Sequence, residues 1–167
     1  MSNVFIINGL PKEEPASIGL MTFKRTDIEN AQYSALLKSE IETEKSTEAM
    51  YLSSFREYPT RMYNCHGMTF ACRRTGIYSD EMIRIILKEE YREIKDRKDV
   101  LSGDVVIYFL GTNILHSAMV MSVNHPIIRV LSKSRAHSEI EHLVDYTPYA
   151  NSEKKFYRIN HETPIII

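Results

Sequence analysis

The stretch RMYNCHGMTFACRRTGIYSDEM, residues 61–82, contains the two clearest helix signals of the chain. In its first half, apolar residues on one face and a glycine at the end, Gly76, predict a helix that begins at Cys65. In its second half, Ser79 is a typical N-cap, and two acidic residues follow where the helix dipole favours negative charge. Apolar residues then recur at steps of four, four and three, which predicts an amphipathic helix of about four turns: Ile83, Leu87, Tyr91 and Ile94.

After residue 100, the helical period gives way to short apolar runs separated by turn residues. These runs predict strands at 105–110, 114–123, 127–133 and 154–159. Before residue 60 the signals are weaker, with a short strand expected at 3–9 and one or two surface helices within 27–56. Helices followed by an antiparallel meander predict an α+β fold in a single domain, 1–167.

Composition excludes several classes of protein. The 167 residues carry a net charge of −1, which does not favour nucleic acid as a partner. No window approaches the ~18 apolar residues of a membrane span, and the first residues lack a secretion signal. We therefore expect a cytoplasmic protein, with export by another system and the oligomeric state left open. The two cysteines lie seven apart in one expected helix, too far for a disulfide, so both should be free thiols.

Cys65 and His116 form a candidate catalytic pair. Cys65 opens the expected helix after a loop containing Pro59, and a helix N-terminus together with an imidazolium lowers the pKa of a thiol. His116 begins the strand 114–123 and shares its face with Ala118 and Val120, the face that the helix should cover. The thiolate would attack a carbonyl while the histidine moves the proton, with backbone N–H groups at the helix start holding the oxyanion. Gly67 would leave room for the substrate.

The order of NCHG, a second helix, SGDVVIYF and HSAMVMSV resembles the NlpC-type and CHAP-type papain-like cysteine hydrolases over roughly residues 58–135. This resemblance implies a helix packed on an antiparallel sheet, with Cys65 as nucleophile and His116 as base. It also implies a third polar residue on the strand after the histidine. Ser132 is the candidate there, expected level with His116; the alternative is that Ser132 only ends the strand and that water or a backbone carbonyl holds the ring. Residues 1–55 match no part of the pattern and form an N-terminal extension of unknown role.

The expected function is a cysteine peptidase or amidase that acts on a peptide or amide substrate through an acyl-enzyme. The alternatives are a cysteine-dependent acyltransferase and a non-catalytic binding module that retains the fold. No cofactor or metal is expected, because the cysteines and histidines lack the short spacings of zinc sites. Of the remaining side chains, Cys72 should be a small core residue and His66 should lie at the cleft edge. His137 and His142 should belong to a solvated polar stretch.

Overall fold

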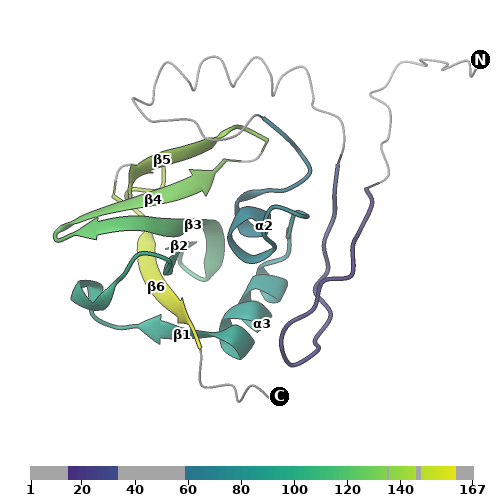
Figure 1. Cartoon of the computed structure of the whole chain (residues 1–167), viewed down its shortest axis with the longest axis horizontal. Helices are drawn as coiled ribbons and strands as arrows, with labels where there is room; N and C mark the ends of the chain where they lie inside the picture. Colours follow the sequence, from purple (N-terminus) through teal and green to yellow (C-terminus); the bar gives the residue numbers. More distant parts are fainter. Residues whose placement is uncertain (1–14, 34–58, 135, 146–147, 161–167) are drawn as a thin grey trace, which may run out of the picture.

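A computed structural model describes residues 15–33, 59–134, 136–145 and 148–160 (Figure 1). Its architecture is α+β, with a six-stranded antiparallel sheet in the order β1-β6-β2-β3-β4-β5. The helices are α2 (Cys65–Phe70), α3 (Asp80–Glu90) and the short 3-10 helix η1 (Arg97–Asp99). The strands are β1 (Tyr91–Ile94), β2 (Val105–Leu110), β3 (Asn113–Asn124), β4 (Ile127–Lys133), β5 (Glu139–Leu143) and β6 (Glu153–Ile159).

The helices cover one face of the sheet. Ile83, Ile86 and Leu87 of α3 pack on Ile107 and Phe109 of β2, and Met68 of α2 packs near Met119 and Leu131. The opposite face carries its own apolar cluster, which includes Val106, Ala118, Val120 and Val130. Because side chains alternate along each strand, a run such as VVIYFL can supply both clusters at once.

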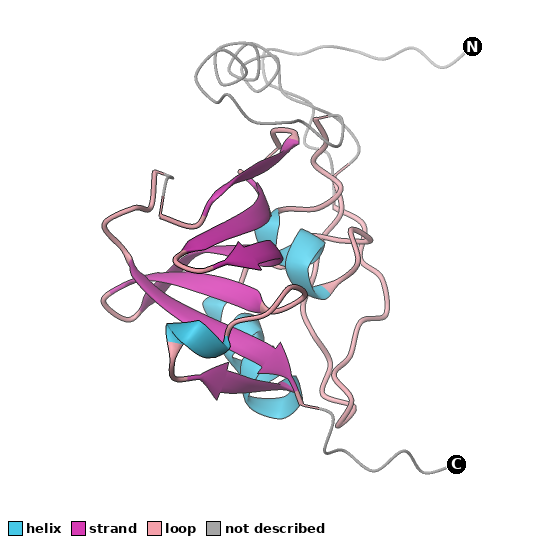
Figure 2. Cartoon of the chain, turned by 60° about the vertical axis from the view of Figure 1, so that its left-hand side comes forward, coloured by secondary structure: helices cyan, strands magenta, loops and turns pink. Residues whose placement is uncertain are grey.

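The segment 15–33 runs along the helices on the side away from the sheet (Figures 1 and 2). Ala31 exchanges backbone hydrogen bonds with Gly76, and the Phe23 amide donates to the Glu90 carboxylate of α3. Residues 27–33 belong to no helix. The rest of the segment in which helices were expected, 34–56, lies outside the described ranges, as does the strand expected at 3–9. None of the helices in those ranges is long and apolar enough to cross a lipid bilayer.

The first helix is shorter than the sequence predicted. It ends at Phe70 because Cys72 and Arg73 adopt positive φ angles of 49° and 65°, which turn the chain back on itself. The returning backbone passes so close that a Cβ on Gly67 would lie 1.8 Å from the Thr75 carbonyl oxygen. Gly67 therefore makes room for the protein's own chain, not for substrate as expected. Cys72 is exposed on the turn, so its assignment to the core was wrong.

The later elements agree better with the sequence. Helix α3 follows Ser79 as predicted, although the Ser79 side chain makes no capping hydrogen bond. The strands expected at 105–110, 114–123, 127–133 and 154–159 are confirmed with small shifts at their ends. The helix was predicted to continue to Ile94, but Tyr91–Ile94 instead pairs with β6. Strand β5 was not predicted, and it places Glu139 and His142 in buried positions, so His142 does not belong to a solvated stretch.

Candidate active site

Asn64 fixes Cys65 at the start of α2. Its side-chain oxygen accepts hydrogen bonds from the amides of Gly67 (2.9 Å) and Ile77 (3.1 Å), and its Nδ2 donates to the Ile77 carbonyl (2.7 Å). One side chain thus caps the helix and ties it to the chain that leads into α3. The Cys65 side chain lines a pocket of about 570 Å³ and is only 8% exposed.

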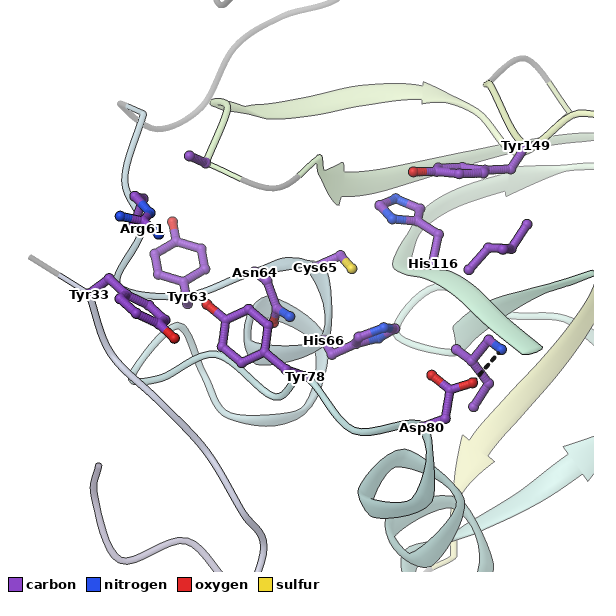
Figure 3. Close-up of a pocket in the computed structure, with 13 residues that line it drawn as sticks. Tyr33, Arg61, Tyr63, Asn64, Cys65, His66, Tyr78, Asp80, His116 and Tyr149 are labelled. Atoms are coloured by element: carbon purple, nitrogen blue, oxygen red, sulfur yellow. Dashed lines mark hydrogen bonds between the residues drawn. The ribbon is translucent and has the colours of Figure 1, made fainter. Parts of the chain in front are cut away.

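His116 lines the same pocket from the first residues of β3, and the Cys65 thiol points toward its ring (Figure 3). His116 pairs with Tyr108 and so belongs to the face opposite the helices. We expected α2 to cover that face, but α2 instead lies on the face of Ser117, to which it is hydrogen-bonded. Strand β4 pairs with β3 only as far as Ala118 and Ser132, so β4 does not flank His116. Because β3 is not covered by β4 at His116, the imidazole ring is accessible to the Cys65 thiol there.

Two tyrosine rings hold the imidazole of His116. Tyr149 stacks on it with centroids 4.7 Å apart and planes inclined by 25°, and Tyr108 lies 5.6 Å away at 46°. The His116 side chain is only 2% exposed. Among the described residues, no hydrogen-bond acceptor is found for the ring nitrogen that faces away from the thiol. Within that part of the chain, aromatic packing sets the ring orientation that a third polar residue would otherwise set.

Ser132 does not lie beside the His116 ring. Its partner on β3 is Ala118, and its hydroxyl is 2.8 Å from Nε2 of His142. The expected register was wrong: a two-residue turn sets Asn124 opposite Ile127, and a bulge between Val120 and Ser122 shifts the pairing by one residue, so that Ser132 lies two residues further along β3 than His116. The structure thus brings Cys65 and His116 together and joins Ser132 to His142.

His66 was missed as a site residue. A step of ~100° around a helix suggested that it would point away from Cys65, but its side chain is 8% exposed and lines the same pocket. Its Nδ1 lies 2.9 Å from the hydroxyl of Ser117, the residue after His116. Adjacent residues of a strand point to opposite faces, so His116 and Ser117 lie on opposite faces of β3. The signal in the sequence was the spacing of His66 and Thr69, which are three residues apart and so share one face of α2. Both side chains contact the hydroxyl of Ser117.

The two imidazoles control the charge of the thiol. Burial alone would raise the pKa of Cys65, but the charges of His66 and His116 and hydrogen bonds with both rings hold it well below its ordinary value. Because α2 has only six residues, its dipole adds little to this effect. The arrangement favours a thiolate beside an imidazolium, which is the reactive form of cysteine.

The start of α2 also offers backbone donors. The Gly67 amide is bonded to the Asn64 side chain and the Met68 amide to the Asn64 carbonyl. Within the described ranges, the amides of Cys65 and His66 are left without an acceptor, as expected for the first residues of a helix. They lie next to the thiol, where an oxyanion would form.

Asp80 forms the wall of the pocket at the start of α3. Its Oδ2 accepts a hydrogen bond from the Ile114 amide at 2.8 Å, which ties α3 to the beginning of β3 (Figure 3). In the described part of the chain, no three His, Cys, Asp or Glu side chains are grouped so as to hold a metal ion.

No family model, curated protein or solved structure matches this chain.

Proposed function

We propose that the protein is a papain-like cysteine hydrolase that cleaves an amide bond through an acyl-enzyme on Cys65. The observation that carries this proposal is the Cys65 thiol, held toward its thiolate form by His66 and His116 in one pocket. The order of elements supports it: a cysteine that opens a helix, then an antiparallel sheet with a histidine at the start of a strand. This is the order of the NlpC-type and CHAP-type hydrolases that the sequence resembles.

The reaction follows from these positions. The Cys65 sulfur attacks the carbonyl carbon, and the oxyanion is stabilised by the amides of Cys65 and His66. The C–N bond then breaks as His116, which carries a proton when the substrate binds, donates that proton to the departing amine. His116 next accepts a proton from a water molecule, which attacks the thioester and releases the acid and the Cys65 thiolate, so that His116 ends the cycle protonated as it began. A second amine in place of water would make the same site an acyltransferase.

A binding module that retains this fold is the second candidate. It is favoured by the absence, within the described ranges, of a hydrogen-bond acceptor behind the His116 ring. An imidazole that acts as a base usually has its second nitrogen held by such a group. The two candidates differ in whether Cys65 is reactive at acidic pH.

The test is site-resolved alkylation with iodoacetamide, followed by mass spectrometry of the native protein. An ordinary thiol with a pKa of ~8.5 is only about 0.3% ionised at pH 6, so its rate there is about 0.004 of its rate at pH 9. We expect this ratio to lie within a few-fold of unity for Cys65. Cys72 is exposed and serves as the reference thiol in the same chain. If the two cysteines showed the same ratio, the catalytic assignment would be refuted and the binding module favoured.

Turnover is then tested on a library of amide and peptide substrates. The Cys65→Ser variant and the His116→Asn variant should lose hydrolysis, whereas Cys72→Ser should retain it. Circular dichroism of each variant checks that the fold is kept.

A further inference from the structure

A chain of hydroxyl groups connects His66 to the backbone of Cys65. Nδ1 of His66 lies 2.9 Å from Oγ of Ser117, which lies 3.0 Å from Oγ1 of Thr69. The Thr69 hydroxyl in turn donates to the Cys65 carbonyl oxygen at 2.9 Å. Ser117 is fully buried, His66 is buried and Thr69 is half-buried, and these groups satisfy one another's hydrogen bonds.

The directions of these hydrogen bonds follow from the groups themselves. A carbonyl oxygen only accepts, so the single hydroxyl hydrogen of Thr69 is directed to Cys65. Ser117 must then donate its own hydrogen to Thr69. Its oxygen is left as an acceptor, and the donor to it is the Nδ1–H of His66. While this chain is intact, Nδ1 of His66 carries a hydrogen, and any further proton binds at Nε2.

We propose that His66 is the imidazolium that keeps Cys65 ionised, which leaves His116 as the proton carrier of the reaction. This inference deepens the proposed function, because it rests on Cys65 as the nucleophile. The S–H bond of Cys65 breaks and an N–H bond forms at Nε2 of His66, while Nδ1 keeps its hydrogen on Ser117. The charges of Cys65 and His66 sum to zero, so this pair by itself adds no net charge to the buried site.

The surroundings of His66 favour its charged form. Burial by itself lowers the pKa of His66, but the charge of Cys65 and a hydrogen bond with it, together with the Asp80 charge, raise it above its ordinary value. Of the ionisable groups that line the pocket, Cys65 and Asp80 act on the pKa of His66. The others in the lining are Arg61, His116, Tyr33, Tyr63, Tyr78 and Tyr149. His116 lies between a stacked Tyr149 ring and a tilted Tyr108 ring, which hold its imidazole in place.

Two matched variants separate the roles of the histidines. In His66→Asn, the amide N–H can replace Nδ1 as the donor to Ser117, but the positive charge is lost. In His116→Asn, the charge of the other ring is lost. We expect the pH midpoint of Cys65 alkylation to rise by roughly one unit or more in His66→Asn, since an adjacent cation commonly shifts a thiol by that much. The rise should be smaller in His116→Asn, which should nonetheless lose hydrolysis. An equal or larger shift in His116→Asn would overturn the proposal.

A second measurement does not depend on the stability of these variants. The ¹⁵N shifts of the imidazoles report which nitrogen of His66 is protonated and its pKa. Because the coupling of two ionisations is reciprocal, Cys65→Ala should lower the pKa of His66. An unchanged titration of His66, or a ring protonated only at Nε2, would refute the inference.

The two proposals can fail separately. Alkylation does not require turnover, so a His66-dependent midpoint in a protein without hydrolytic activity would support the role of His66 and reject the proposed function. Hydrolysis that needs Cys65 and His116, together with an unshifted midpoint in His66→Asn, would do the reverse.

Discussion

A buried ion pair between Arg73 and Glu139 should be a main support of the loop that carries the nucleophile. The Glu139 carboxylate accepts from Nε (2.6 Å) and Nη2 (2.8 Å) of Arg73 and from the hydroxyl of Tyr63 (2.9 Å). The Glu139 side chain is 1% exposed, whereas that of Arg73 is 40% exposed. Tyr63 precedes Cys65 by two residues, so the carboxylate connects β5 both to this loop and to the turn after α2.

Replacing Arg73 with alanine would leave the carboxylate buried with only the Tyr63 hydroxyl as a described partner. Removing one member of a buried pair costs about 3–5 kcal/mol. We expect about 3 kcal/mol, because one side of the pair is near solvent and the Tyr63 hydrogen bond remains. Domains of this kind have about 5–15 kcal/mol of stability, so the loss is a large fraction of the total. With a urea m-value of about 2 kcal/mol/M, the midpoint should fall by roughly 1.5 M.

The neighbouring residue provides the control for this measurement. Arg74 is also exposed, and its Nε makes only a long hydrogen bond of 3.4 Å, to the Ala71 carbonyl. Arg74→Ala should change the free energy of unfolding by about 0.5 kcal/mol or less. The double variant Arg73→Ala/Glu139→Gln should be more stable than Arg73→Ala alone, because it no longer buries an unpaired charge. An Arg73→Ala variant as stable as Arg74→Ala, or a double variant less stable than the single one, would refute this reasoning.

Two further predictions concern the backbone and the pH dependence of stability. Gly67→Ala should unfold the protein or lower its free energy of unfolding by several kcal/mol, because the new Cβ would lie 1.8 Å from the Thr75 carbonyl oxygen. Gly19→Ala is the control, because a Cβ there would have no atom within 4 Å. Equal melting temperatures for the two variants would contradict this prediction. Burial lowers the pKa of His142, so below the ordinary histidine value of ~6.5 the unfolded chain binds a proton that the native state resists. Stability should therefore fall as the pH drops from ~6.5 toward the lower native pKa, and His142→Asn should reduce this dependence in urea titrations at pH 7.5 and 5; parallel losses in both proteins would exclude His142 as the cause.

The sequence by itself determined the elements whose signals are local. The helix starts at Cys65 and after Ser79 depend on local signals, because capping and charge preferences act within one turn: Asn64 caps the first helix, and Asp80 and Glu81 occupy the first turn of the second. The strands between 105 and 133 were predictable because tight turns leave consecutive strands paired. The order of a helix-start cysteine and a strand-start histidine also indicated Cys65 and His116 as the candidate catalytic pair.

Only the tertiary structure decided where the first helix ends and which polar residues are buried. The turn at Cys72 and Arg73 ends the helix and brings Thr75 against Gly67, and periodicity does not encode such a turn. The segment of β5 was predicted to be solvated because its buried Glu139 is paired with Arg73, 66 residues away, and such a partner cannot be recognised from the sequence. The role of His66 likewise depends on Ser117, 51 residues away in sequence. A buried polar group is stable only with its partner, and the partner is chosen by the fold of the whole chain.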